Sequence, residues 1–208
     1  NGLAIVRLNG KYGYIDKSGK FVIAPTFDSA APFSEGLAVV SINGKYGFID
    51  RDGNTKIDFK FLTAFSFDEG FASFSVDRQK FGLIDLTGRI VIEPKFDWLS
   101  GFSDGLASVN IGMTWHGHQK SGGKYGYINT QGLIVIPVEY EVANSFSEGL
   151  APVRKNGKWG FIDKTGVMRI SPEFDWAERF DEGISKVTVG EKIRYINKAG
   201  KYIWKPSE

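Results

Sequence analysis

The segment MTWHGHQK, which begins at Met113, contains both histidines of the chain, His116 and His118, beside Trp115. If the segment is extended, the two histidines face the same side, because side chains two residues apart share a face. They would then offer two imidazole nitrogens to a metal ion. A structural zinc site needs about four ligands, and the neighbouring sequence supplies no others. We therefore expect no metal site and interpret Trp115, His116 and His118 as contact residues of a long loop.

The sequence does not specify a nucleophile with its general base. A Ser or Thr nucleophile needs a base positioned beside it, and no Ser or Thr is marked by its context as the partner of either histidine. Cysteine is absent, which excludes a thiol nucleophile and a thiolate metal site. We expect a noncatalytic protein without a cofactor.

Acidic residues recur in Asp-x-x-Gly segments that begin at Asp16, Asp50, Asp85 and Asp163. A calcium loop gathers several oxygen ligands within about 12 residues, whereas each of these segments offers one or two carboxylates. Asp starts a tight bend by hydrogen bonding to its own backbone, and Gly tolerates the left-handed position that completes it. We interpret the segments as turns rather than as cation sites.

The composition indicates a folded protein without a dominant charge. The 208 residues are 42% hydrophobic and 14% aromatic, which is enough to bury a core, and 26 Lys and Arg residues balance 24 Asp and Glu residues. A formal net charge of +2 gives no general attraction for nucleic acid. No window holds the run of about 18 to 20 apolar residues that a membrane-spanning helix requires. We expect no nucleic-acid partner and no membrane span in this chain.

The chain is built from an internal repeat. The block FSEGLA at Phe33 recurs in related forms at Phe67, Phe102, Phe146 and Phe180. The spacings are 34, 35, 44 and 34 residues. A second block, Lys-aromatic-Gly, recurs at Lys11, Lys45, Lys80, Lys124 and Lys158, with an altered sixth version at Lys192. Six repeats of about 34 residues therefore fill residues 1–208 as one array, and the long spacing places an insertion at about 112–123.

Each repeat has the pattern of three strands. LAVVSI from Leu37 is rich in β-branched residues, and the Asn43-Gly44 pair after it supplies the positive φ angles of a type I′ hairpin turn. YGFID from Tyr46 alternates between two faces, and its glycine leaves room for a close neighbour. After the Asp-x-x-Gly turn, a third strand such as KFVIAP from Lys20 ends at a proline. We therefore expect an all-β fold.

Two further sets of repeated residues invite a binding interpretation. The lysine of Lys-aromatic-Gly and the acid at Glu35, Glu69, Asp104, Glu148 and Glu182 could form a ladder for a ligand. We expect exposed ion pairs between stacked repeats instead. The aromatic column Tyr12, Tyr46, Phe81, Tyr125 and Trp159 could form a sugar platform, but large aromatics dominate cores and we expect burial.

Trp98 and Trp176 are different, because the repeat does not require them. Each follows Phe-Asp in a link between repeats, where other repeats carry Ser29 or Val142. We therefore add Trp98 and Trp176 to Trp115, His116 and His118 as candidate ligand-binding residues.

Lys-(Tyr/Trp)-Gly-(Phe/Tyr)-Ile-Asp-x-x-Gly, followed by an aliphatic strand and Phe-(Ser/Asp)-Glu-Gly-Leu-Ala, resembles the WG repeat, also called the KWG repeat, of bacterial proteins. The resemblance covers essentially all of the chain and is closest at KWGFIDKTG from Lys158. The last repeat departs from the pattern at Ile193 and Arg194, which we interpret as a terminal cap. The resemblance implies a repeat β-protein without assigned catalytic residues, in the cell envelope, the periplasm or the secreted fraction.

These patterns predict six tandem three-stranded antiparallel meanders of about 34 residues in an open stacked array, with a closed β-propeller as the alternative. We expect a monomer that recognises a protein or carbohydrate partner as a noncatalytic binding module. The alternative function is a structural spacer or a sensor ectodomain segment of a larger protein.

Overall fold

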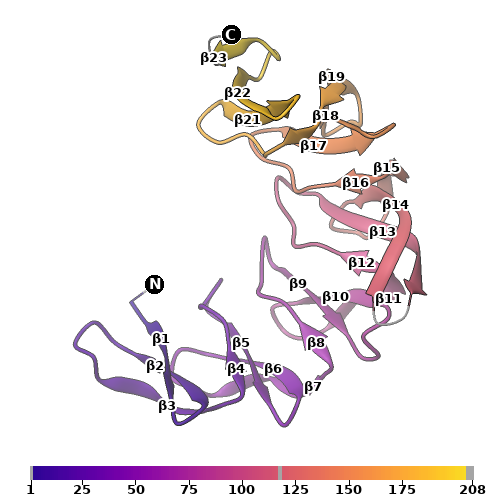
Figure 1. Ribbon diagram of the computed structural model, residues 1–208. Coiled ribbons are helices and arrows are strands. Elements are labelled where there is room, and N and C mark those ends of the chain that lie inside the picture. Colours follow the sequence, from indigo (N-terminus) through magenta and orange to yellow (C-terminus); the bar gives the residue numbers. More distant parts are fainter. Residues whose placement is uncertain (1, 117–118, 205–208) are drawn as a thin grey trace. The chain divides into compact units, whose positions relative to one another are not determined.

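The computed structural model describes residues 2–116 and 119–204, which form 23 β-strands and no helix. The strands make six separate antiparallel sheets, none closed on itself, and each sheet uses strands that are consecutive in the sequence (Figure 1). The chain divides into two compact units, Asn1–Phe96 and Asp97–Glu208, with three sheets in each. The predictions of an all-β fold and of six repeats are confirmed.

The first unit contains β1 to β11. Its first sheet has the order β1-β2-β3, with the bounds Ala4–Leu8, Lys11–Ile15 and Phe21–Phe27. The second sheet has the order β4-β5-β6-β7, with the bounds Ser29–Ala30, Ala38–Ile42, Lys45–Ile49 and Thr55–Phe61. The third sheet, β8 to β11, has the bounds Thr63–Ala64, Phe71–Ser75, Phe81–Asp85 and Ile90–Phe96.

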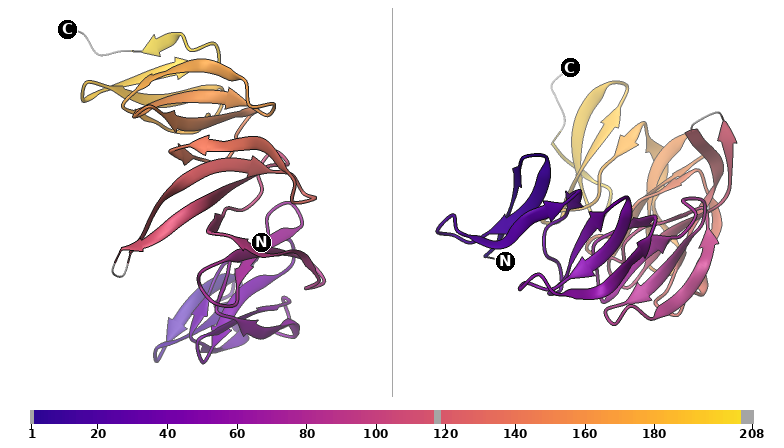
Figure 2. Two further views of the ribbon diagram at one scale, coloured as in Figure 1. Left: turned by 90° about the vertical axis from the view of Figure 1, so that its right-hand side faces the viewer. Right: turned by 90° about the horizontal axis from the view of Figure 1, so that it is seen from below.

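The second unit contains β12 to β23, and its three sheets stack face on face (Figure 2). The first of them consists of β12 to β15: Trp98–Leu99, Ala107–His116, Gln119–Ile128 and Ile134–Tyr140. The next consists of β16 to β19: Val142–Ala143, Leu150–Lys155, Lys158–Asp163 and Met168–Phe174. The last consists of β20 to β23: Trp176–Ala177, Ile184–Val189, Lys192–Asn197 and Tyr202–Trp204.

Five of the six sheets have four strands, so the prediction of three strands per repeat is wrong for them. The extra strand has two residues and comes from the link between repeats. In β4, Ser29 pairs with Ser41 and Ala30 pairs with Val40 of the following hairpin. The link forms a strand because its backbone amides lie against that hairpin and need hydrogen-bond partners. The prolines do not end the third strand either, since Pro25 lies inside β3.

A close backbone contact explains the repeated glycine. Gly47 lies in β6 beside a bulge, where the pairing with β7 shifts between Tyr46–Phe61 and Phe48–Ile57. A Cβ atom on Gly47 would lie 2.7 Å from the carbonyl oxygen of Ile57, and therefore no side chain fits without moving a strand. The same contact occurs at Gly13, Gly82, Gly126 and Gly160. The prediction that this glycine marks a close approach is confirmed.

The core is a series of aromatic pairs between consecutive sheets. Phe48 of one sheet packs on Phe67 of the next with ring centroids 4.8 Å apart. Equivalent pairs are Tyr14–Phe33, Tyr127–Phe146 and Phe161–Phe180. In four of the five Lys-aromatic-Gly blocks the core aromatic is thus the residue after the glycine, and in the third block the buried Leu83 takes that position. The predicted column is only partly buried, since Tyr12, Tyr46 and Tyr125 lie beside the hairpin turns and remain half-exposed.

The recurring serine and acid join neighbouring repeats within a unit through the backbone. Ser34 Oγ donates to the carbonyl oxygen of Phe67 at 2.7 Å, and the Glu35 carboxylate accepts the N–H of Gly70 at 2.9 Å. The second unit repeats the bonds Ser103 to Phe146, Gly149 to Asp104, Ser147 to Phe180 and Gly183 to Glu148. This corrects the predicted charge ladder between the lysines and these acids.

The lysine of the Lys-aromatic-Gly block pairs with a different carboxylate. Lys11 contacts Asp28, and Lys158 contacts Asp175, each at 2.5 Å. The same Asp28 carboxylate accepts the N–H of Asn43, a residue of the next hairpin turn, at 2.6 Å. The aspartate of the Phe-Asp link therefore binds a lysine of the preceding repeat and the turn of its own repeat, a role that the sequence pattern does not reveal.

Candidate functional site

The insertion at 112–123 extends a β-hairpin, which corrects the prediction of a loop. β13 and β14 keep one register through to the pair His116–Gln119. The buried Asp97 carboxylate accepts the N–H of Gly112 at 2.8 Å, as Asp28 does for the turn residue Asn43 in the second sheet. The additional residues continue past the usual turn position as strands, because ladder pairing satisfies their backbone polar groups.

The structure does not gather the predicted contact residues at one place. Trp115 and His116 lie at the far end of β13, and His118 lies outside the described residues. Trp98 in β12 pairs with Asn110, five residues before Trp115. At about 3.3 Å per residue, roughly 16 Å of strand separates the backbones of Asn110 and Trp115. Trp176 belongs to a third location, β20 in the last sheet.

Trp98 and Trp176 occupy equivalent positions, each the first residue of a two-residue strand. Trp98 is 38% exposed and Trp176 is 49% exposed, and their role as contact residues stays a prediction. Trp159, which is only 4% exposed, meets Trp176 edge-on with ring centroids 5.1 Å apart. This contact holds the Trp176 indole in place while leaving about half of it open to solvent.

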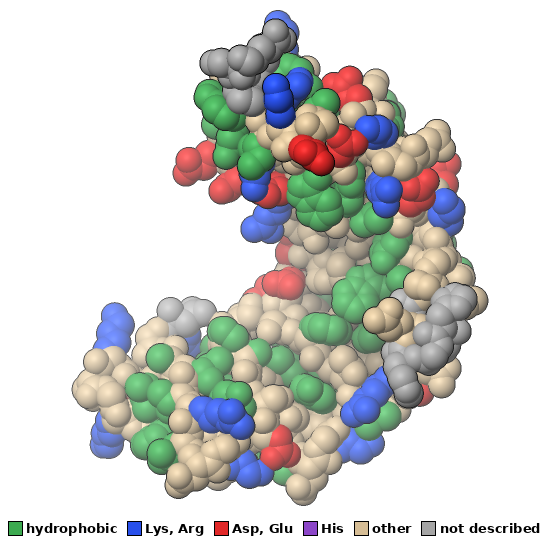
Figure 3. Space-filling model, viewed as in Figure 1, with side chains coloured by type: hydrophobic (Ala, Val, Ile, Leu, Met, Phe, Trp, Pro, Cys, Tyr) green, Lys and Arg blue, Asp and Glu red, His purple; other side chains and the backbone are tan. Residues whose placement is uncertain are grey.

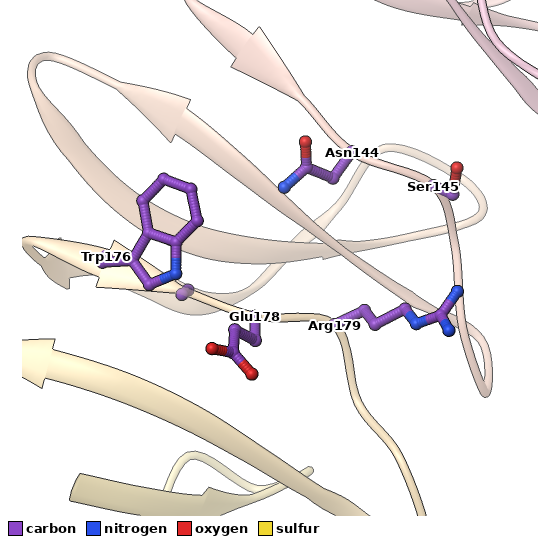
Figure 4. A pocket seen from close by; sticks show the side chains of 6 residues that line it. Asn144, Ser145, Trp176, Glu178 and Arg179 are labelled. Carbon is purple, nitrogen blue, oxygen red and sulfur yellow. The ribbon is translucent and has the colours of Figure 1, made fainter. Parts of the chain in front are cut away.

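Trp176 forms one end of an open pocket of about 420 Å³ in the second unit. The last sheet supplies Trp176, Ala177, Glu178 and Arg179, and the preceding sheet supplies Asn144 and Ser145. Figure 4 shows the indole of Trp176 and the guanidinium of Arg179 toward opposite ends, with Glu178 between them and the Asn144 amide pointing toward the indole side. The pocket therefore presents one aromatic surface and several polar groups.

Some of these polar groups are already bonded within the protein. Lys186 Nζ contacts the Glu178 carboxylate at 3.1 Å. The side chains of Asn144, Ser145 and Arg179 have no hydrogen bond or ion pair with the described part of the chain. The pocket thus keeps an amide, a hydroxyl and a guanidinium available to a ligand, and its excess charge is positive because Glu178 is neutralised.

A second pocket, of about 440 Å³, lies in the first unit and is lined in part by Glu35, Asp50 and Lys56. Its charged groups serve the fold. Glu35 accepts the N–H of Gly70, and Asp50 accepts the N–H of Asn54 at 2.9 Å and contacts Lys56 at 3.1 Å. Hydrogen bonding by Asn54 lowers the pKa of Asp50 to about 2, so the carboxylate stays ionised and committed to its turn. We therefore place the candidate site at Trp176.

The repeat pattern singles out Trp176 but not its neighbours in the pocket. A signal for them was present in the comparison of one repeat with another. We call the five two-residue strands, each together with the two residues that follow it, the short-strand edge. The first of these four positions holds Ser29, Thr63, Trp98, Val142 or Trp176. The third position holds Ala31, Phe65, Ser100, Asn144 or Glu178. These positions vary where the surrounding pattern repeats, and Glu178 and Arg179 are among the variable residues.

In the part of the chain that the structure describes, no three or more His, Asp or Glu side chains are grouped as metal ligands would be. The described residues also include no helix with the length and apolar character needed to cross a membrane.

Solved structures of low sequence identity share the fold of the chain. BamB from Moraxella catarrhalis is 11% identical, with a TM-score of 0.56 over 100% of this chain and 73% of that one. A eukaryotic initiation factor is 11% identical, with a TM-score of 0.64 over 99% of this chain and 62% of that one. The Dos1 propeller is 14% identical, with a TM-score of 0.52 over 99% and 67%. The chain therefore spans between about three fifths and three quarters of these structures and has a propeller-like β-fold.

A comparison with curated protein sequences gave no match. The family model described as WG containing repeat matches five segments, residues 12–46, 46–78, 81–115, 125–159 and 159–192. Each matched segment begins on the aromatic of a Lys-aromatic-Gly block, at Tyr12, Tyr46, Phe81, Tyr125 or Trp159. Together the matches cover well over half of the sequence, and the chain belongs to the WG repeat family.

Proposed function

We propose that this chain is a noncatalytic interaction module that recognises a protein or glycan partner through its short-strand edge. The observation that carries the proposal is the open pocket at Trp176, where an aromatic ring is half-exposed beside an uncommitted amide, hydroxyl and guanidinium. Tryptophan and arginine are the residue types that most often dominate binding energy at protein surfaces.

In the short-strand edge, the residues that would contact a partner differ from the residues that pack in the core. The second residue of each short strand faces the core and is Ala30, Ala64, Leu99, Ala143 or Ala177. The first residue is Ser29, Thr63, Trp98, Val142 or Trp176, and in four of the five short strands it is more exposed than the second residue. A scaffold with fixed inner positions and variable outer positions suits binding, because the variable side chains can change without loss of the core.

The surface charge is consistent with such a partner and not with nucleic acid. Acidic and basic side chains are interspersed over the last two sheets, with hydrophobic side chains between them (Figure 3). Nucleic-acid binding depends on concentrated positive charge. The family resemblance supports placing the protein in the envelope, the periplasm or the secreted fraction of a bacterium, and this location is part of the proposal.

The test has two steps. First, the purified chain, with a photo-crosslinking probe placed near Trp176, is applied to cells of the native host to label its partner. The affinity of the chain for the purified partner is then measured. Trp176→Ala should weaken binding at least about tenfold. Trp204→Ala removes an equally exposed tryptophan from β23, outside the short-strand edge, and should bind as the wild type does. Equal binding by both variants and the wild type would favour the spacer alternative.

We also propose that the six sheets form an open stacked array and that the chain is monomeric. The support is that each sheet consists of consecutive strands, so that no sheet needs a strand from a distant repeat to be complete. Spin labels on β2 and β22 test the arrangement. Separations near the roughly 10 Å spacing of packed sheets would indicate a closed ring instead. Sedimentation equilibrium tests the monomer.

A further inference from the structure

We propose that the pocket formed by Asn144, Ser145, Trp176, Glu178 and Arg179 binds a carboxylated carbohydrate, such as a chain of uronic acids. The inference rests on the proposed function, since it names the ligand of the same site. It follows from three properties of the pocket: the main-chain groups of Glu178 and Asn144 are hydrogen bonded, the aromatic surface is fixed, and Arg179 has no ion-pair partner among the described residues.

One residue on each wall of the pocket, Glu178 and Asn144, has both of its main-chain polar groups hydrogen bonded. The Glu178 N–H donates to the carbonyl oxygen of Lys186 at 2.9 Å, and the Glu178 carbonyl accepts Ser185 Oγ at 2.6 Å. On the opposite wall, the Asn144 N–H donates to Pro152 and its carbonyl accepts the Tyr127 hydroxyl at 2.7 Å. Burial raises the pKa of Tyr127 far above its ordinary value, so the hydroxyl remains a donor.

These bonds disfavour a peptide as the ligand. A peptide that adds to a strand edge gains affinity from main-chain hydrogen bonds, and neither Glu178 nor Asn144 has a main-chain group to spare. A sugar needs no such groups. Its hydroxyls bond to side chains, and Asn144, Ser145 and Arg179 offer side-chain donors and acceptors that have no partner among the described residues.

The aromatic surface suits the apolar face of a sugar ring. The indole of Trp176 is half-exposed and is held edge-on by the buried Trp159, so its orientation is fixed before a ligand binds. Pre-organised aromatic side chains lose little conformational entropy on binding. The pocket volume of about 420 Å³ lies within the range of about 300 to 1,000 Å³ that is typical of small-molecule sites.

The unpaired charge selects an acidic sugar over a neutral one. Lys186 neutralises Glu178 at 3.1 Å, which leaves the Arg179 guanidinium as the uncompensated charge of the pocket. A guanidinium binds a carboxylate through two parallel hydrogen bonds. A uronic acid provides a carboxylate for Arg179, a ring face for Trp176, and hydroxyls for Asn144 and Ser145.

The experiment is isothermal titration of the whole chain with three probes: tetragalacturonate, the neutral tetrasaccharide maltotetraose, and tetraglutamate. We expect tetragalacturonate to bind at least about tenfold more tightly than either of the others. Arg179→Gln should remove the preference for the acidic sugar, and Trp176→Ala should weaken binding of both sugars. Trp204→Ala and Arg51→Gln are the matched controls, since each removes an exposed residue of the same type elsewhere.

Two results would overturn the inference. If the acidic and neutral sugars bind equally and Arg179→Gln does not change their affinities, Arg179 does not select an acidic sugar. Binding of tetraglutamate alone, or of no probe at all, would show that the ligand of the pocket is not a carboxylated carbohydrate. The proposed function would survive either result if a partner from the native host still depends on Trp176, and it fails separately if that partner binds the Trp176→Ala variant normally.

Discussion

Replacing Gly47 with valine should destabilise the first unit strongly. The new Cβ atom would lie 2.7 Å from the Ile57 carbonyl oxygen and 3.0 Å from the Phe59 nitrogen, whereas ordinary contacts begin near 3.4 Å. Both neighbours are backbone atoms, so no side-chain rotation relieves the clash and β6 must separate from β7. Overpacking of this kind costs about 1 to 3 kcal/mol, and the branched side chain places Gly47→Val near the upper end.

The loss should be measured as a shift in the thermal unfolding midpoint. For a unit of about 100 residues, 1 kcal/mol corresponds to roughly 4 to 8 °C, so Gly47→Val should lower the midpoint of the first unit by about 10 to 20 °C. All five tryptophans belong to the second unit, Asp97–Glu208. Circular dichroism therefore follows both units, while tryptophan fluorescence follows the second one. An early transition seen only by circular dichroism assigns the damage to the first unit.

Two controls make the test specific. Lys45→Ala removes the neighbouring repeated residue, which is exposed, and should cost under about 1 kcal/mol. Gly160→Val creates the equivalent clash in the second unit, where the Cβ atom would lie 2.5 Å from the Ile170 carbonyl oxygen, and should shift the fluorescence transition. If Gly47→Val and Lys45→Ala lower the midpoint equally, the close backbone contact does not constrain the fold.

Two further predictions concern stability. Replacing residues 112–123 with Asn-Gly should leave the melting temperature nearly unchanged, because Asp97 can accept the new turn N–H as Asp28 accepts that of Asn43; a large loss would make the extended hairpin part of the core. Hydrogen bonds from neighbouring side chains lower the pKa of Asp85 and Asp163 from 3.8 to about 2. A lowered carboxyl pKa stabilises the fold above pH 3.8, and this stabilisation is lost as the pH falls toward 2. The unfolding free energy of a variant with asparagine at both positions should fall less over this range, and an identical acid profile for the wild type would contradict the assignment.

Much of the fold was predictable because the same residue types recur at the same positions of each repeat. The Asn43-Gly44 turn, the glycine at position 47 and the acidic turns each require one residue type, and repetition makes such requirements visible. The short strands were not predictable in this way. A two-residue strand such as β4 has no periodicity of its own, and it forms because the following hairpin offers its link hydrogen-bond partners.

The insertion shows a different limit of sequence reasoning. Gly112, Gly122 and Gly123 indicate a break in regular structure, and all three have positive φ angles. They nonetheless lie within two paired strands. A glycine can mark a kink within a strand as well as a loop, and the sequence of the insertion alone does not decide between them. The paired strands of β13 and β14 decide it in favour of a hairpin.

The candidate site illustrates why repeated and unrepeated residues carry different information. Repeated residues such as Phe180 and Glu148 are fixed by contacts with the neighbouring sheet, and the same contacts recur from repeat to repeat. Arg179 lies directly before Phe180, yet its side chain is exposed and has no hydrogen bond or ion pair with the described part of the chain. A long charged side chain contributes little to a fold when it is unpaired, and the binding that we propose beside Trp176 would account for the arginine.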